Sequence, residues 1–177
     1  MSGELPRTGR LGERPKIDVR PTEASDVDEL LDLYESVAAE RVYIAGEPPI
    51  DRSRRRSAWI ALADGDSAGR SFVAVAEQAL VGMASVTGVS PLDLGMMVAA
   101  PWRGKGAGTK LLEACIDFGR TSGAHKICLE VWPHNEGAIA LYEKHGFVQE
   151  GYRRKQWRRR NGELWDSIMM GLLLVDE

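Results

Sequence analysis

The stretch 92–119, LDLGMMVAAPWRGKGAGTKLLEACIDFG, limits the fold most tightly, because it joins a strand, a glycine-rich turn and a helix. The apolar strand ends before Pro101, and the helix carries its apolar residues on one face. The start of a helix exposes unpaired N–H groups and favours an anion, and glycines let the backbone approach that anion closely. The turn is therefore either a phosphate cradle or a packing turn that leaves Arg103 and Lys105 in solvent.

Three phosphate-binding patterns can be compared with this turn. A P-loop needs a lysine and then a hydroxyl residue after its last glycine, whereas here Thr109 precedes Lys110. A dinucleotide fingerprint needs G-x-G-x-x-G, whereas these glycines alternate as G-x-G-x-G; Glu130 lies at about the distance of a ribose-binding acid and keeps dinucleotide binding open. The third pattern, R-x-x-G-x-G, fits Arg103–Gly108.

The rest of the chain predicts one domain over 16–177, preceded by a disordered tail over 1–15 that is rich in Gly, Pro and Arg. The hydrophobic patterns give the order β-α-α-β-β-β-α-β-α-β-β. Thr22 or Ser25 is expected to cap the first helix, Asp51 the second and Asn135 the last, which stops at Gly146; Asn161-Gly162 predicts a C-terminal hairpin.

Composition excludes several classes of protein. The chain has 177 residues, 44% of them hydrophobic, and a net charge of −3, which is unlike a general nucleic-acid binder. Cys115 and Cys128 lack metal-ligand spacing and are expected to be buried thiols in a reducing compartment. No signal peptide or bilayer-spanning run is evident. We therefore expect a cytoplasmic protein without a metal or a membrane partner.

Two motifs together resemble the GNAT N-acetyltransferase superfamily. The first is Arg103–Gly108 after MMVAAP, and the second is LEVWPHNEGAIALYEKHGFVQEG, about thirty residues on. The resemblance covers 16–175 and implies an α+β protein with the acyl-CoA N-acyltransferase fold, a six- to seven-stranded mixed sheet flanked by about four helices. The ending RRNGELWDSIMMGLLL is similar to that of bacterial L-amino-acid and ribosomal-protein N-acetyltransferases, with the aromatic residue shifted by one place at Trp165.

This resemblance implies acetyl-CoA as cosubstrate and assigns residues to it. Met97 and Val98 would pair with the pantetheine arm along a strand edge, and Asn135 would bind its amides. Tyr142, seven residues from Asn135 and on the same helix face, would protonate the leaving thiolate. The pyrophosphate would bind the turn, at Arg103, Gly104, Lys105, Gly106, Ala107, Gly108 and Thr109.

Glu130 matches the position of the base that takes the proton of the acceptor amine, although an ordinary surface glutamate is nearly as consistent with the sequence. Glu77 and Asp93 are the alternatives, and His134 and His145 are less favoured, since His145 is expected to cap its helix.

The acceptor site is expected between the first two helices, with Glu40, Tyr43 and Glu47, and the C-terminal hairpin. The basic run 153–160 in that hairpin is typical of a solvated strand edge.

The sequence therefore predicts acetyl transfer to a free amino acid or another small primary amine. A protein N-terminus as acceptor, a non-catalytic acyl-CoA-sensing module and a dinucleotide-dependent oxidoreductase stay open as alternatives. A homodimer is expected.

Overall fold

The computed structural model describes residues 15–65 and 68–175. The predicted tail therefore lies outside the described residues, apart from Pro15. The predicted order of elements and the α+β class with a mixed sheet are confirmed. The helices and strands are β1 (Asp18–Pro21), α1 (Val27–Ala39), α2 (Arg52–Asp64), β2 (Gly69–Ala76), β3 (Ala79–Thr87), β4 (Leu92–Val98), α3 (Ala107–Thr121), β5 (Lys126–Val131), α4 (Glu136–Lys144), β6 (Val148–Arg158) and β7 (Leu164–Leu173), with short 3-10 turns at Ala24–Asp26 and Ala100–Trp102.

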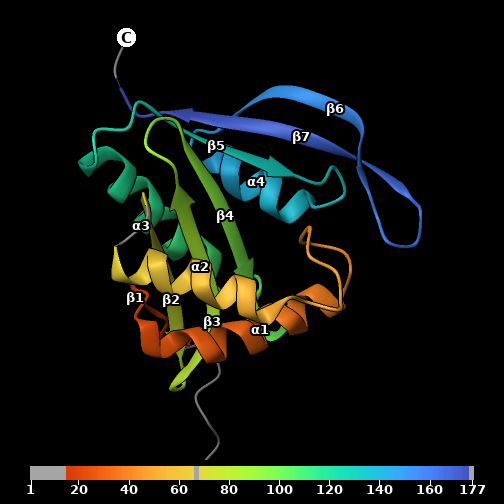
Figure 1. Ribbon diagram of the computed structural model, residues 1–177. Coiled ribbons are helices and arrows are strands. Elements are labelled where there is room, and N and C mark those ends of the chain that lie inside the picture. The colour runs from red at the N-terminus through yellow and green to blue at the C-terminus, as the bar shows by residue number, and fades with distance from the viewer. Residues whose placement is uncertain (1–14, 66–67, 176–177) are drawn as a thin grey trace, which may run out of the picture.

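The seven strands form one sheet in the order β1-β2-β3-β4-β5-β7-β6. Neighbouring strands run antiparallel except β4 and β5, which are parallel. These two strands pair only where Leu92 meets Ile127 and Asp93 meets Cys128. Beyond that point they separate, as the green and teal strands in Figure 1 show. The sheet is therefore open in its middle.

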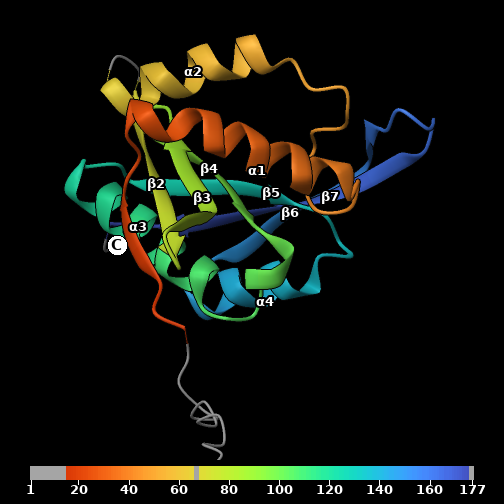
Figure 2. The same ribbon diagram turned by 90° about the horizontal axis from the view of Figure 1, so that it is seen from below.

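Helices cover both faces of the sheet: α1 and α2 lie on one face, and α3 and α4 lie on the other (Figure 2). Side chains alternate along each strand, so β4 contributes to two cores. Leu92 and Leu94 pack in the core with α3 and α4, whereas Met97 packs in the core with α1 and α2. Each fully buried side chain of this size contributes about 1.5–3 kcal/mol to the free energy of folding. The β4 strand, on one side of the opening, is therefore anchored in both cores.

Two of the predicted helix caps are confirmed and one is wrong. The Asp51 carboxylate accepts from the Arg54 N–H at 3.0 Å, and the Asn135 side chain caps α4. The start of α1 uses neither Thr22 nor Ser25. Instead the Asp26 carboxylate accepts from the Glu23 N–H at 2.8 Å and from the Arg20 guanidinium at 2.7 Å. An ionised acceptor fixed by an arginine is stronger here than a hydroxyl.

The cysteine prediction is correct for one residue and wrong for the other. Cys115 is buried in α3, and burial raises the pKa of its thiol to about 12. Cys128 is only half-buried, because on β5 its neighbours Ile127 and Leu129 take the core face and Cys128 takes the other. No helix in the described part of the chain is long and apolar enough to cross a membrane.

Candidate functional site

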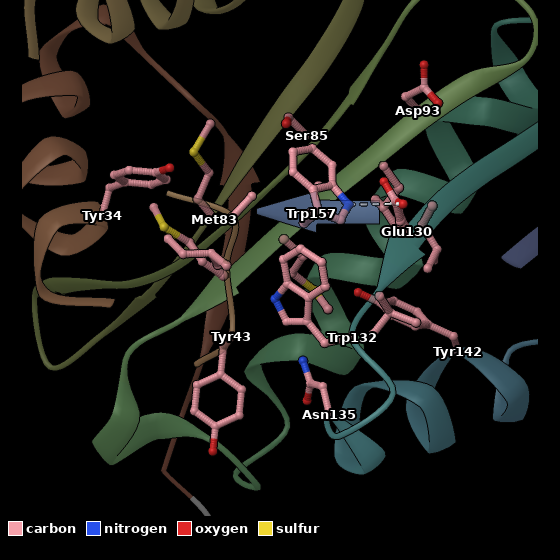
Figure 3. A pocket seen from close by; sticks show the side chains of 18 of the residues that line it. Tyr34, Tyr43, Met83, Ser85, Asp93, Glu130, Trp132, Asn135, Tyr142 and Trp157 are labelled. Carbon is pink, nitrogen blue, oxygen red and sulfur yellow. Dashed lines mark hydrogen bonds between the residues drawn. The ribbon is translucent and has the colours of Figure 1, made fainter. Parts of the chain in front are cut away.

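A cavity of about 410 Å³ lies where β4 and β5 separate. Its walls come from β4 between Asp93 and Met97, from β5 between Leu129 and Val131, and from α1, α2, α4, the loop around Tyr43, and β6. Figure 3 shows Glu130 and Tyr142 on one side and Tyr34 on the other in this view. The cavity thus joins elements from the middle of the chain to the first two helices and the C-terminal hairpin.

One edge of β4 faces this cavity. Its other edge is paired with β3, from Gly82 opposite Val98 to Thr87 opposite Asp93. Past Asp93, the described residues provide no strand partner on the β5 side. A strand edge of this kind can bind an extended ligand through main-chain hydrogen bonds. Met97 lines the cavity, whereas the Val98 carbonyl already accepts a hydrogen bond from Arg103 Nε at 3.0 Å.

The glycine turn that follows β4 depends on backbone freedom at two positions. Gly104 and Gly106 have φ of 72° and 97°, and a Cβ at either position would meet no atom within 4 Å. Glycine is therefore required by backbone conformation and not by lack of space. Gly106 is the N-cap of α3 and has no side chain to cap the helix. The N–H groups of the first helical turn, from Ala107 to Thr109, can therefore bind an anion. Gly108 has another role, since a Cβ there would lie 3.3 Å from Leu141.

Arg103, which the resemblance assigned to the pyrophosphate, is held by protein groups. Its guanidinium donates to both carboxylate oxygens of Glu40 at 2.6 and 2.7 Å and lies 4.3 Å from the centre of the Tyr43 ring. The hydrogen bonds with Glu40 raise the pKa of Arg103 above its ordinary value. Arg103 and Glu40 therefore join the glycine turn to the end of α1. Lys105 stays exposed beside the turn, 5.0 Å from the Trp102 ring.

Asn135 and Tyr142 both line the cavity from α4. The side-chain oxygen Oδ1 of Asn135 accepts a hydrogen bond from the Ala138 N–H at 3.4 Å, so the side-chain NH₂ group is the part available to a ligand. Tyr142 is 7% exposed, and burial raises the pKa of its hydroxyl to about 12. An ordinary thiol has a pKa near 8.5. Tyr142 is consequently suited to donate a hydrogen bond to a forming thiolate, more than to lose its proton outright.

Glu130 faces the cavity from β5 and is held by three groups of the hairpin. Its Oε1 accepts from the Ser167 hydroxyl and, at 3.2 Å, from Trp157 Nε1, and it lies 3.6 Å from the Arg153 guanidinium. These contacts all use Oε1, so Oε2 is the atom available to an incoming amine or water. The contacts also fix the direction of the carboxylate.

The four alternative bases lie in different places. Asp93 lines the cavity on the neighbouring strand, whereas Glu77 lies in the β2–β3 turn, outside the lining. His134 Nε2 lies 2.9 Å from the Val42 carbonyl oxygen, and His145 Nδ1 lies 2.8 Å from that of Leu141, at the end of its helix. Among these four, Asp93 is the one that lines the cavity.

Of the three residues predicted for the acceptor, Tyr43 lines the cavity and Glu40 and Glu47 do not. Glu40 is bound to Arg103, and Glu47 pairs with Arg159 at 3.1 Å. The basic run is exposed along the edge strand β6, as predicted, but that description is wrong for Arg159, which is 5% exposed. Its guanidinium lies 4.3 Å from the Trp165 ring, and the Glu47 carboxylate balances its charge.

Sequence reasoning missed the aromatic and cationic residues of the acceptor end. Tyr34, Arg55, Trp59 and Trp157 all line the cavity. The spacing of Arg55 and Trp59, four residues apart, places both on one helix face and was the available signal. Nothing in the sequence shows that this face meets the hairpin residue Trp157.

Comparisons with known proteins agree with this arrangement. The sequence pattern of the Acetyltransferase (GNAT) family matches residues 28–147. An L-methionine sulfoximine/L-methionine sulfone acetyltransferase of Pseudomonas aeruginosa is 27% identical over 168 residues, which cover 88% of this chain and 94% of that protein. A [ribosomal protein bS18]-alanine N-acetyltransferase of Salmonella typhimurium is 41% identical over 68 residues, covering 38% and 45% of the two chains.

Solved structures show the same fold. The structure of yncA, a putative acetyltransferase from Salmonella typhimurium with its cofactor acetyl-CoA, matches with a TM-score of 0.79 and 21% identity over 91% of this chain and 95% of that one. The chain spans about a fifth to about half the length of several other curated relatives that it matches, from 21% to 54%. The family pattern extends from α1 past the end of α4, so it includes the glycine turn and the Asn135–Tyr142 helix. The chain therefore belongs to the GNAT acetyltransferase family.

Proposed function

We propose that this protein transfers the acetyl group of acetyl-CoA to a primary amine by direct attack in a ternary complex, and that the acceptor is a free amino acid or another small amine. The observation that carries the proposal is the cavity between β4 and β5, which the Tyr142 and Glu130 side chains and an unpaired strand edge share. The relative that is similar over 88% of the chain acts on amino-acid derivatives.

The residues present fit acetyl-CoA. The exposed edge of β4 would pair with an extended pantetheine arm, and the open turn at Gly104 and Gly106 leaves room for a pyrophosphate. Asn135 would donate its NH₂ group to an amide carbonyl of the arm. Acetyl-CoA supplies the thioester that the amine attacks.

The side chains would then act on protons. The α-amine of a peptide titrates near pH 8 and a lysine amine near 10.4. The amine of a free amino acid lies between the two, because its own carboxylate stabilises the ammonium form, so a proton acceptor is needed at neutral pH. Glu130, through Oε2 and an ordered water, would take the proton as the C–N bond forms. A main-chain N–H on the β4 edge would donate to the carbonyl oxygen as negative charge develops there. Tyr142 would donate its hydrogen bond to the sulfur as the C–S bond breaks.

The test is a thiol-release screen with acetyl-CoA against amino acids, polyamines, aminoglycosides and short peptides. We expect acetyl-CoA to raise the melting temperature and NAD to leave it unchanged, and at least one small amine to release thiol. Stabilisation by NAD alone would favour the dinucleotide alternative. Stabilisation by acetyl-CoA without thiol release from any amine would favour a non-catalytic sensing module.

Two variants assign the base. Glu130→Gln is expected to reduce kcat about 10²-fold, in the usual range for general base catalysis, and to shift the pH–rate profile upward. Asp93→Asn is the matched control from the neighbouring strand and is expected to reduce kcat less. The reverse order of effects would assign the base to Asp93.

A protein N-terminus is the second candidate acceptor. The 41% identity with the ribosomal-protein enzyme over 68 residues favours it, since it exceeds the 27% identity over the longer match. Preference for a peptide with a free N-terminus over every free amino acid would establish it.

The homodimer and the cytoplasmic location remain predictions. Exposed apolar side chains on β6 and β7, including Val148, Tyr152 and Leu173, support the homodimer.

A further inference from the structure

Arg55 of α2 lies at the junction of two hollows. It lines the 410 Å³ cavity between β4 and β5 and also a neighbouring hollow of about 640 Å³ between α2 and the hairpin. Ala45, Trp59 and Trp157 are shared by the two hollows in the same way. A molecule that enters from the second hollow therefore reaches Arg55 before it reaches Glu130 and Tyr142.

The Arg55 guanidinium is packed on aromatic rings and has no acidic partner among residues 15–65 and 68–175. Its Cζ lies 3.7 Å from the centre of the Tyr34 ring and 5.5 Å from that of Trp59. Its Nε is buried without a hydrogen-bond partner among the described residues. A guanidinium carries five N–H donors, and a buried donor without a partner is costly. Such a group is suited to a ligand that brings its own acceptor.

Two of the other three arginines of the same helix show that acidic partners are available nearby. Arg52 pairs with Asp32 and Glu35 at 3.0 and 2.7 Å, and Arg56 pairs with Asp28. These pairs tie α2 to α1 on the outside of the molecule. Arg55 faces the hollows instead, and no carboxylate in the described ranges lies within ion-pair distance of it.

Arg55 is also held in position. Gly46 packs so closely on Tyr34 that a Cβ on Gly46 would lie 1.9 Å from the tyrosine oxygen. Trp59 packs edge-on against the same ring, with 5.8 Å between the ring centres. Tyr34 therefore has little freedom, and neither has the guanidinium stacked on it. A preorganised cation of this kind favours two parallel hydrogen bonds to one carboxylate.

The two ends of the cavity differ in charge. Glu130 and Asp93 lie at the end near Tyr142, and Arg55 lies beside Tyr34, which Figure 3 shows on the opposite side in this view. Arg54, Arg158 and Arg160 line the outer hollow. Two acids also line it. Glu47 already pairs with Arg159, and Asp51 caps α2. A molecule with an amine at one end and an anion at the other matches this polarity, whereas a polyamine opposes it.

We propose that Arg55 binds the carboxylate of the acceptor, so that the acceptor is an amino acid and not a polyamine or another amine without an anion. The proposal rests on the acetyl transfer proposed above. Arg55 is a specificity-determining residue in this account. The amine of the same acceptor points toward Glu130.

The experiment compares L-methionine sulfone with its carboxamide and with its decarboxylated amine in the thiol-release assay, and includes spermidine. We expect kcat/KM to be about tenfold to a hundredfold higher for the acid, the range for hydrogen bonds to a charged group. Arg55→Gln should remove this preference, and Arg55→Lys should restore part of it. Arg56→Gln, a neighbour paired on the outside, is the matched control and should keep the preference.

The outcomes separate the two proposals. Equal rates for the acid and the carboxamide, a preference for spermidine, or equal losses on both substrates in Arg55→Gln would overturn the role of Arg55 and leave acetyl transfer standing. No thiol release from any amine would overturn both. Acetyl-CoA should stabilise all variants equally, because Arg55 is not part of the proposed acetyl-CoA site.

Discussion

The two halves of the candidate site are built from different material. The half that we propose for acetyl-CoA consists mainly of backbone: the edge of β4 that faces the cavity, the glycine turn and the first N–H groups of α3. The acceptor half consists of side chains from α1, α2, the loop between them and the hairpin. A backbone site needs only a short local pattern, whereas a side-chain site needs distant segments to meet. The reaction class can therefore be inferred from the sequence, whereas the acceptor cannot.

The largest expected effect concerns the acceptor half, which depends on one buried ion pair. Arg159→Met would leave Glu47 without its partner, and breaking a buried pair costs about 3–5 kcal/mol. We expect the free energy of unfolding in urea to fall by that amount. Arg158→Met, on the exposed edge next to it, is the control and should change it by about 0.5 kcal/mol or less.

Removing both partners of the ion pair should lower the free energy of unfolding less than removing one. Glu47→Leu combined with Arg159→Met is expected to recover part of the lost stability, since no uncompensated charge stays buried. An Arg159→Met protein as stable as the Arg158→Met control would show that the pair does not hold the loop.

The next effect lies where the halves meet. Tyr142→Phe would remove the proposed hydrogen bond to the leaving sulfur and is expected to lower kcat about 10²-fold with little change in acetyl-CoA affinity. Steady-state kinetics and the thermal shift with acetyl-CoA measure the two quantities. Tyr152→Phe, an exposed tyrosine bonded to Asp166, is the control. An unchanged kcat would remove Tyr142 from the chemistry.

A smaller effect is expected in the backbone half. Gly106→Ala forces a side chain into a left-handed conformation at φ 97°, at a cost of about 1–2 kcal/mol. The KM for acetyl-CoA should rise about tenfold, while the preference among acceptors stays the same. Gly137→Ala, in α4 without positive φ and with open space around the Cβ, is the control. A change in acceptor preference would contradict the division of the site.

The smallest effect tests the support of the acceptor half at the start of α1. The hydrogen bonds from Arg20 hold the pKa of Asp26 below its ordinary value, so Asp26 contributes stability above about pH 4 and loses it as the pH falls through the lower folded value. Asp26→Asn should destabilise the protein by about 1 kcal/mol at pH 7, because Arg20 is partly exposed. The difference should shrink below pH 4. A constant difference across that range would exclude an ionic origin; Asp18→Asn is the exposed control.

Most of the fold was accessible from local signals. Glycine, proline and capping residues mark the ends of elements, and Asp51, Asn135 and Gly146 mark them where the structure does. Side-chain alternation likewise gives the two faces of β4. The predicted cap of α1 was wrong because Arg20, on the preceding strand, holds the Asp26 carboxylate in the capping position. This tertiary contact cannot be predicted from local sequence propensities.

The site was less accessible for the same reason. Arg103 and Glu40 are 63 residues apart, and nothing in the sequence shows that their side chains pair. The orientation of Arg55 depends on how Gly46 packs on Tyr34. Long-range pairing of charged side chains depends on final positions within a few ångströms, which periodicity does not supply.

The burial of Tyr142 has a consequence for how the rate should respond to pH. A hydroxyl with a pKa of about 12 keeps its proton over the whole range in which enzymes are usually assayed. Alkaline solution therefore frees the attacking amine without stripping the donor at the sulfur. If Tyr142 has the proposed role, the rate should rise with pH to a plateau, without the falling limb of a bell-shaped profile, because the tyrosine does not titrate in that range.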